Sequence, residues 1–239
     1  MLTILIISIF HFFLIEQDIC EIQNRGIGGN STSDLIFRVD LDVLFQKPDI
    51  VIILIGTNDM VNTGKMISYD EFSHNLDKLI FLFRNKNIDV VLVSPPPVDT
   101  LYLYERHDKT KFSESPNCKL EIAANILKIK SQENNLTFID IYSQFKSMGV
   151  PSHNSDSLIN NVNNSGLRDG VHPTSHGYRI IAQEIFNKLL LDGKIKKDVK
   201  IICYGDSITF GVHVAGEGTT NGETYPAFLK RMIYSYFSK

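Results

Sequence analysis

The sequence predicts an α/β fold, a single three-layer α/β/α sandwich with a mainly parallel five-stranded sheet. Two observations predict it. Short apolar runs rich in β-branched residues alternate with segments of helical periodicity, a pattern typical of parallel sheets covered on both faces. In addition, three short glycine-containing motifs follow these runs directly, and ligands of such sheets bind beyond the carboxyl ends of the strands.

Five segments are expected to form the strands. Four are continuous apolar runs of the kind found in strands buried on both faces, and the first is a weaker run that leads into a glycine cluster. In chain order the expected strands are residues 20–24, 50–55, 89–94, 137–141 and 199–204.

Helical periodicity predicts four helices between or after these strands. The first covers residues 69–85, with Ser68 as its N-cap; its apolar face is Phe72, Leu76, Leu79, Ile80 and Phe83. The second is expected around Ile122, Ile126 and Ile129, and the third over residues 178–189. The fourth begins at Tyr225-Pro226, because proline suits the first turn of a helix.

Three polar segments are expected to be loops. They are the proline-containing residues 95–116, the Ser/Asn-rich residues 143–168 and the glycine-rich residues 211–222. Binding sites are often built from loops that a rigid scaffold positions. These segments are therefore predicted to shape the substrate cleft.

Length and composition favour one domain and exclude some partners. The 239 residues suffice for one well-buried domain, expected over residues 18–239. A net charge of −3 gives no reason to expect a polyanionic partner, so nucleic acid is not an expected ligand. The three cysteines are widely spaced and are interpreted as free thiols.

Residues 1–17 form an apolar N-terminal segment. The apolar run of residues 1–15 is shorter than the roughly 20 residues of a typical transmembrane helix. A secretory signal is expected to carry a basic residue before its apolar core, but the first basic residue is Arg25. A packed or interfacial element and a cytoplasmic location are therefore favoured over export or a membrane anchor through residues 1–15, and these alternatives stay open. The sequence predicts no oligomeric state.

Two motifs contain the parts of an activated serine. Ser207 lies in Tyr204-Gly205-Asp206-Ser207-Ile208-Thr209, a turn between an expected strand and a helical segment. Serine is a poor nucleophile unless a neighbouring base takes its proton. Asp169-Gly170-Val171-His172-Pro173 offers that base, His172, and a carboxylate, Asp169, that can hold the imidazole in one tautomer. Ser207, His172 and Asp169 are the predicted catalytic residues.

With Gly26-Ile27-Gly28-Gly29-Asn30 and Gly56-Thr57-Asn58-Asp59, these motifs form a set that resembles the SGNH (GDSL) hydrolases, and the resemblance covers residues 20–239. It implies the flavodoxin-like fold of that family. It also implies an oxyanion hole formed by the backbone N–H groups of Ser207 and Gly29 and the side-chain amide of Asn58, with Gly28 as the alternative glycine.

No cofactor and no metal are expected. The glycine cluster lacks the G-x-G-x-x-G spacing of dinucleotide sites. His176 follows His172 at a helical metal-ligand spacing, but no third ligand is evident, so His176 is interpreted as a surface histidine.

Four other polar residues are interpreted as having no part in the chemistry. Asp59 is expected to brace the turn at Asn58, and Asp206 to hold the serine loop through bonds to the backbone. His153 and His213 belong to no recognisable constellation in the sequence.

The motifs occur in an unusual order. Ser207 follows His172 by 35 residues, whereas serine comes first in the family that the chain resembles. A circular permutation explains this order, with residues 191–198 joining the old ends and the last strand inserting into the sheet. The catalytic geometry would survive, because it depends on positions in space. Alternatively, the chain is a catalytically silent fragment of a tandem hydrolase, in which Ser207 would not face His172 of the same molecule.

The resemblance implies a serine esterase that hydrolyses acetyl or short-chain esters of carbohydrate or lipid through an acyl-enzyme. The expected partner is thus a small-molecule or carbohydrate ester. One alternative is a metal-dependent phosphoesterase, although two-metal sites need more Asp and His ligands at strand ends than the sequence offers. A second is a ligand-binding module without catalysis on the same fold. Acyl chain length, the alcohol part of the ester and the choice between hydrolysis and acyl transfer stay open.

Overall fold

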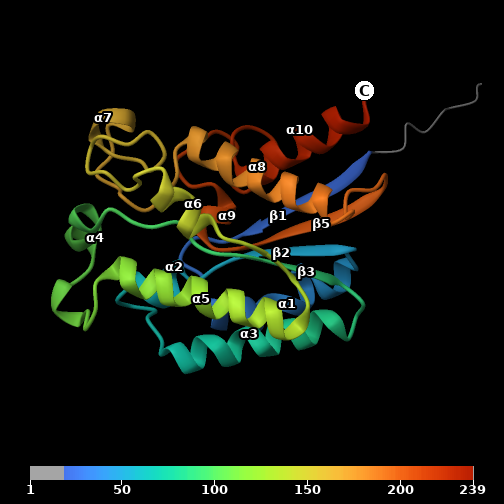
Figure 1. The fold of residues 1–239 in the computed structure, drawn as a ribbon, viewed down its shortest axis with the longest axis horizontal. Helices are drawn as coiled ribbons and strands as arrows, with labels where there is room; N and C mark the ends of the chain where they lie inside the picture. The colour runs from blue at the N-terminus through green and yellow to red at the C-terminus, as the bar shows by residue number, and fades with distance from the viewer. Residues whose placement is uncertain (1–18, 239) are drawn as a thin grey trace, which may run out of the picture.

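Five parallel strands form one sheet in the order β1-β5-β2-β3-β4 (Figure 1). The computed structural model describes residues 19–238, so the apolar segment expected over residues 1–17 lies outside the described residues. The predicted α/β fold with a five-stranded parallel sheet is confirmed. The strands are β1 (Cys20–Gly26), β2 (Ile50–Leu54), β3 (Asp89–Val93), β4 (Thr137–Ile139) and β5 (Val199–Gly205).

The last strand in the sequence lies inside the sheet. Gly205 of β5 pairs with Gly26 of β1 on one side and with Leu54 of β2 on the other. Counting from β5, the strand order becomes 2-1-3-4-5, which is the flavodoxin-like order. Because the three strands are parallel, the segment after β5 therefore lies between the segments that follow β1 and β2, at the carboxyl ends of the strands.

Helices cover both faces of the sheet (Figure 1). Helices α1, α3 and α5 pack on one face, and α6, α8 and α10 on the other. The longer helices are α1 (Thr32–Asp42), α3 (Tyr69–Arg84), α5 (Pro116–Asn134), α8 (Ser175–Leu191) and α10 (Tyr225–Phe237). The short ones are α2 (Thr57–Val61), α4 (Thr100–Arg106), α6 (Ile141–Ser147), α7 (Val162–Ser165) and α9 (Ser207–Phe210), with 3₁₀ turns η1 (Leu44–Gln46) and η2 (Lys109–Lys111).

The sheet has one apolar core on each face, and the alternation of side chains along the strands explains both cores. Val51 and Ile53 of β2 face α1 and α3, whereas Ile52 faces α8, and all three side chains are fully buried. Because strand side chains alternate between faces, a strand covered on both sides must be apolar at every position. This is why β2 is a continuous apolar run.

The predicted helix over residues 69–85 is confirmed as α3, and the Ser68 hydroxyl caps it by accepting a hydrogen bond from the backbone N–H of Glu71. The helix expected around Ile126 also forms, as α5, but its buried face is different. Ile129 is 51% exposed, and the fully buried positions include Ala123. The small alanine side chain lets the helix backbone approach its neighbours, so the isoleucine periodicity indicated the wrong face.

Two of the expected loops contain helices. Residues 95–116 include α4, and residues 143–168 include α7 and the end of α6. The strand expected over residues 137–141 ends at Ile139, because Asp140 caps α6 by accepting from the Ser143 backbone N–H. These short helices begin at polar caps rather than at an apolar repeat, which is why periodicity did not predict them.

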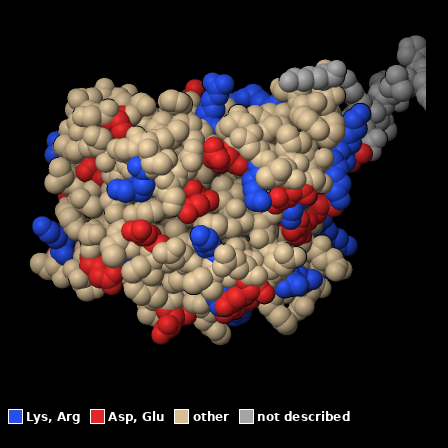
Figure 2. Space-filling model, in the orientation of Figure 1, with Lys and Arg blue, Asp and Glu red and all other residues tan. Residues whose placement is uncertain are grey.

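The face of the molecule in Figure 2 mixes acidic and basic side chains, so no field of a single sign dominates that face. Within residues 19–238, no helix is both long enough and apolar enough to cross a bilayer.

Candidate active site

Ser207 is the first residue of α9, in the turn that directly follows β5. Gly205 permits this turn, because a Cβ there would lie 2.2 Å from the Leu54 carbonyl oxygen. Asp206 caps α9 by accepting a hydrogen bond of 2.8 Å from the Ile208 backbone N–H, as predicted. The turn thus holds the hydroxyl of Ser207, which is only 8% exposed, at the carboxyl edge of the sheet.

His172 lies between Ser207 and Asp169. Its Nε2 is 3.0 Å from Ser207 Oγ, and its Nδ1 is 3.0 Å from Asp169 Oδ1 and 3.1 Å from Oδ2. All three side chains belong to one chain. The structure therefore brings the three predicted catalytic residues into one continuous hydrogen-bonded series.

Asp169 is held as a carboxylate by its surroundings. Its Oδ2 accepts from the backbone N–H of His172 at 2.7 Å, and the Arg106 guanidinium lies 3.3 Å from Oδ1. Burial raises the pKa of Asp169, but the hydrogen bonds and charges of His172 and Arg106 outweigh it, and the net pKa is below the ordinary value. An ionised Asp169 keeps the proton of His172 on Nδ1 and leaves the Nε2 lone pair facing the serine.

Asn160 fixes the backbone on both sides of His172. Its carbonyl accepts from the Gly170 N–H at 2.9 Å, and its backbone N–H donates to the His172 carbonyl at 2.9 Å. Its side-chain amide donates to the carbonyls of His172 and Pro173. Asn160 is thus a positioning residue that the sequence analysis missed, because it lies within a Ser/Asn-rich segment with no distinguishing spacing.

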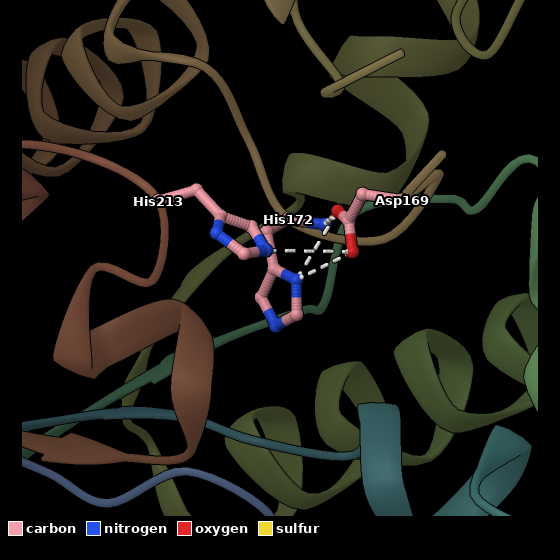
Figure 3. Close-up of side chains that lie close together, drawn as sticks. All are labelled: Asp169, His172 and His213. Carbon is pink, nitrogen blue, oxygen red and sulfur yellow. Dashed lines mark hydrogen bonds and ion pairs between the residues drawn. The ribbon is translucent and has the colours of Figure 1, made fainter. Parts of the chain in front are cut away.

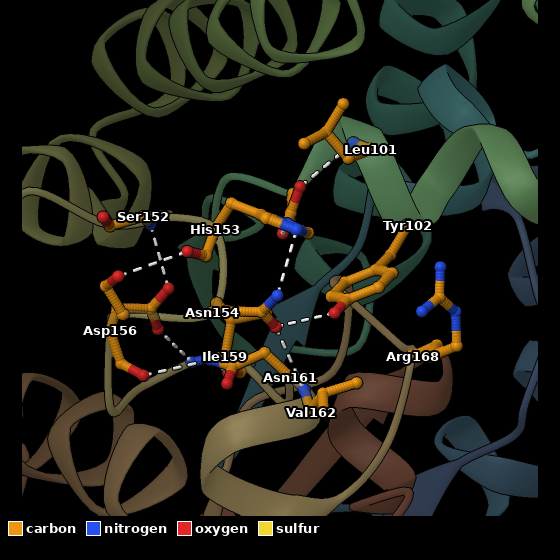
Figure 4. Close-up of polar contacts among 12 residues, drawn as sticks. Leu101, Tyr102, Ser152, His153, Asn154, Asp156, Ile159, Asn161, Val162 and Arg168 are labelled. Atoms are coloured by element: carbon orange, nitrogen blue, oxygen red, sulfur yellow. Dashed lines mark hydrogen bonds and ion pairs between the residues drawn. The ribbon is translucent and has the colours of Figure 1, made fainter.

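The surrounding loop is ordered mainly by amide side chains (Figure 4). Asn161 Oδ1 accepts from the backbone N–H groups of Asn163 and Asn164. Asn154 Oδ1 accepts from the Tyr102 hydroxyl at 2.6 Å, as Figure 4 shows. These bonds join the loop to α7 and α4. The segment expected to line the cleft therefore has a defined shape next to His172.

The predicted oxyanion donors lie after three adjacent strands. Ser207 follows β5, Gly29 follows β1, and Asn58 is in α2, which follows β2. Asn58 Nδ2 donates to the Asn30 carbonyl at 3.0 Å, which joins the loops after β1 and β2 and leaves its second N–H for a ligand. Gly29 has φ +77°, a left-handed conformation that favours glycine.

Arg38 of α1 also links the segments that follow β1 and β5. Its guanidinium donates to the Gly205 carbonyl at 2.8 Å and to the Arg25 carbonyl at 2.9 Å, and its Nε donates to Asn30 Oδ1 at 2.7 Å. It also lies over the Tyr204 ring, 4.4 Å from the centroid. The planar guanidinium of Arg38 thus aligns the serine turn with the glycine loop.

We expect Asn58→Ala to lower kcat for ester hydrolysis by about 10²–10³-fold with little change in KM, because oxyanion donors act mainly in the transition state. The measurement is steady-state kinetics on p-nitrophenyl acetate. Asn62→Ala is the matched control, since Asn62 Nδ2 donates to Asn58 Oδ1 at 3.0 Å and supports it only indirectly. That control is expected to lose less than about tenfold. Equal losses in the two variants would contradict a direct role for Asn58.

Asp59 has a different role from the one predicted. Its Oδ1 accepts from the backbone N–H of Thr32 at 2.9 Å and from the Thr32 hydroxyl at 2.5 Å, so it anchors the start of α1 rather than the turn at Asn58. Within the described residues its Oδ2 is buried without a hydrogen-bond partner. Burial raises the pKa of Asp59 to about 6, although the bonds from Thr32 lower it.

This pKa predicts a pH dependence of stability. Between about pH 4 and pH 6 the folded state keeps the Asp59 proton that the unfolded state has lost, so the free energy of unfolding falls as pH rises through this window. We expect it to fall by about 3 kcal/mol relative to Asp59→Asn, which cannot titrate. Urea unfolding of both proteins at pH 4, 5 and 7 measures the difference. Parallel stability curves would contradict the raised pKa.

Two histidines without an assigned role in the sequence do have partners. His213 Nε2 lies 3.9 Å from Asp169 Oδ1 (Figure 3). The rings of His213 and His172 pack edge to face, with their centroids 5.3 Å apart. His153 Nδ1 lies 2.6 Å from Asp99 Oδ2. The interpretation that both lack a constellation is wrong. These contacts join loops far apart in the sequence, so no local spacing could have indicated them. His176 is exposed, as predicted.

The sequence model of the GDSL-like lipase/acylhydrolase family matches residues 16–180. This range includes Gly29, Asn58, Asp169 and His172 and ends before Ser207. The uncharacterized lipoprotein YqeF of Bacillus subtilis is 29% identical over 183 residues, which cover 71% of this chain and 74% of the lipoprotein. An acetylxylan esterase of Geobacillus stearothermophilus is 24% identical over 177 residues, 71% of this chain and 72% of the esterase.

Solved structures show the same architecture. The crystal structure of the acetyl xylan esterase AlAXEase superimposes with a TM-score of 0.55 and 26% identity, over 68% of this chain and 77% of that one. The lipase/acylhydrolase of Enterococcus faecalis gives a TM-score of 0.53 at 24% identity, over 67% of this chain and 71% of that one. From the family match and the shared fold we conclude that the chain belongs to the GDSL-like lipase/acylhydrolase family and is an ester-hydrolysing enzyme.

Proposed function

We propose that this enzyme is a serine esterase in which Ser207 forms an acyl-enzyme. The observation that carries the proposal is the unbroken contact from Ser207 Oγ through His172 to Asp169 within one chain. A hydroxyl in reach of an imidazole that a carboxylate orients is the arrangement that activates serine. Structures of the acetylxylan esterase from Geobacillus stearothermophilus include catalytic mutants at a serine, an aspartate and a histidine, the same three residue types.

In the proposed reaction, Ser207 Oγ bonds to the ester carbonyl carbon while His172 Nε2 takes the hydroxyl proton. Asp169 stabilises the resulting imidazolium. Nε2 then gives the proton to the alcohol oxygen as its bond to the acyl carbon breaks. A water molecule next gives a proton to Nε2 and attacks the acyl carbon, and Ser207 regains a proton as the carboxylic acid leaves.

Negative charge on the carbonyl oxygen is proposed to be met by the N–H groups of Ser207, Gly29 and Asn58. Ser207 is in the first turn of a helix, where backbone N–H groups have no partner within the helix. The bond from Asn58 to Asn30 and the bonds of Arg38 hold these donors in place before substrate arrives. Such preorganised donors are each worth about 3 kcal/mol of barrier.

As substrates we propose acetyl or other short acyl esters of carbohydrate, with short-chain lipid esters as the alternative. The support comes from two similar proteins that are named acetylxylan esterases. We expect kcat/KM to be higher for p-nitrophenyl acetate than for the butyrate and octanoate, and acetate to be released from acetylated xylooligosaccharides. A preference for octanoate would contradict the short-chain assignment.

The serine mechanism is tested separately from the substrate. A serine-directed organophosphate should abolish turnover and add its mass to the peptide containing Ser207, whereas a chelator should leave the activity intact. The metal-dependent phosphoesterase predicts the opposite pair of results. Labelling at Ser207 with no hydrolysis of any ester would instead favour the ligand-binding module.

We also propose that the order of the motifs reflects a circular permutation. Three observations support it: β5 lies between β1 and β2, the family match ends before Ser207, and Ser207 contacts His172 of the same chain. The last observation disfavours a fragment of a tandem protein. Specific activity that stays constant on dilution of a monomer would agree with the permutation, and activity only in an exchanged dimer would contradict it.

A further inference from the structure

His213 lies next to the proposed catalytic residues but has no role in the proposed reaction. It follows α9, and its Nε2 is directed at the Asp169 carboxylate (Figure 3). Together with Asp169 and His172 it forms a cluster of two imidazoles and one carboxylate, defined here as the His-Asp-His cluster. We propose that this cluster is an inhibitory zinc site.

The spacing within the His-Asp-His cluster suits Zn²⁺. Bonds of about 2.0–2.1 Å in a tetrahedral site place neighbouring ligand atoms about 3.3 Å apart. In the structure Asp169 Oδ1 is 3.0 Å from His172 Nδ1 and 3.9 Å from His213 Nε2, and the three ligand atoms all lie within 4.8 Å of one another. Small side-chain rotations would bring all three to bonding distance. Three protein ligands leave the fourth position for water, a donor set like the two imidazoles and one carboxylate of known zinc enzymes.

The backbone presents His213 to the cluster in a fixed way. His213 has φ +69°, a left-handed conformation that is uncommon for a residue other than glycine. Its backbone N–H donates to Glu217 Oε1 at 2.8 Å, which ties it across the loop after α9. The side chain is 38% exposed, so an ion from solvent can reach Nε2.

Zinc at this site would stop the proposed reaction by changing the tautomer of His172. The ion binds the Nδ1 lone pair, so the proton on Nδ1 is lost to solvent and Nε2 takes one up, with no net change in protonation. Nε2 then donates to Ser207 Oγ and cannot take its proton. The same ion occupies Asp169 Oδ1, the oxygen that otherwise accepts from Nδ1. This consequence rests on the proposed function, whereas zinc binding itself does not.

Arg106 opposes the ion. Its guanidinium lies 3.3 Å from Asp169 Oδ1, close to the oxygen that would bind zinc. Repulsion between the guanidinium and the ion should weaken binding, although Arg106 does not itself offer a ligand atom. Two substitutions should therefore change zinc affinity in opposite directions: His213→Gln removes a ligand, and Arg106→Gln removes a competing charge.

The test measures binding and inhibition separately on the full chain. Binding is followed by titration calorimetry with Zn²⁺ and by the visible absorption of Co²⁺, and inhibition by turnover of p-nitrophenyl acetate at each zinc concentration. We expect His213→Gln to weaken zinc binding by at least about tenfold and to raise the inhibitory concentration equally. Its basal activity should stay within about fivefold of the parent, because His213 takes part in no step of the proposed reaction. His176→Gln, a change at an exposed histidine four residues past His172, should alter neither quantity.

Each outcome decides the proposal. Weaker binding in His213→Gln, tighter binding in Arg106→Gln and no change in His176→Gln would support the site. Zinc that binds all variants equally, or that activates the enzyme, would overturn it. Zinc that binds through His213 without inhibiting would keep the site and contradict the role proposed for His172.

Discussion

Replacing Ser207 with alanine is expected to lower kcat for p-nitrophenyl acetate by at least about 10⁴-fold, because the remaining groups can bind the ester but cannot form the acyl-enzyme. The fold should persist. The hydroxyl of Ser207 contacts His172 Nε2, whereas the turn is held by Asp206 and by the close approach of Gly205 to Leu54. The measurement combines steady-state kinetics with a thermal melt.

Ser147→Ala is the matched control for this substitution. Ser147 is an exposed serine at the end of α6, and within residues 19–238 its hydroxyl donates to the Gln144 carbonyl of its own helix. Its replacement should leave kcat unchanged. Activity retained in Ser207→Ala with an unchanged melting temperature would rule out Ser207 as the nucleophile.

Replacing Asp169 with asparagine is expected to lower kcat by about 10⁴-fold, a loss of the size seen when the carboxylate of such a triad is made neutral. The side-chain oxygen of asparagine can still accept from the backbone N–H of His172, which Asp169 Oδ2 accepts at 2.7 Å. Its NH₂ group then faces His172 Nδ1, and only the tautomer with a bare Nδ1 accepts from it. The proton therefore moves to Nε2, which no longer accepts the proton of Ser207.

Asp99→Asn distinguishes this effect from a general loss of buried charge. Asp99 is also buried and also pairs with a histidine, His153, but it does not contact Ser207 or His172. Its replacement should cost far less activity. Organophosphate labelling of Asp169→Asn should slow in proportion to kcat, because both reactions need the activated serine. Similar losses from Asp99→Asn and Asp169→Asn would point to a structural effect instead.

The elements that sequence patterns predicted are those whose role in the fold is expressed locally. The β2 strand is apolar at every position because it is covered on both faces, and α3 repeats its buried side chains every three to four residues. The helix α1 was not predicted, since Phe37 and Leu41 on its surface are exposed and blur its apolar face. In α5 the buried alanines gave no periodic signal.

The residues of the candidate site likewise divide into those that a short motif indicates and those that only the structure reveals. Ser207, His172 and Asp169 could be selected because each lies in a short motif whose chemistry is recognisable, and the structure brings the three together. Their catalytic roles stay predictions for the experiments above. His213 could not be selected, because its partner Asp169 lies in a distant segment and His213 belongs to no motif.

The sequence by itself determined the strands, the helices α3, α5, α8 and α10 and the three residues proposed for catalysis, because apolar repeats and short motifs are properties of neighbouring residues. The motif order also predicted that the last strand inserts into the sheet, but only the tertiary structure decided that it pairs with β1 and β2 and that Ser207 lies 3.0 Å from His172. It also decided that Arg38 bridges two loops and that His213 reaches Asp169. These arrangements depend on contacts between segments that lie far apart in the chain, and no local pattern encodes those contacts.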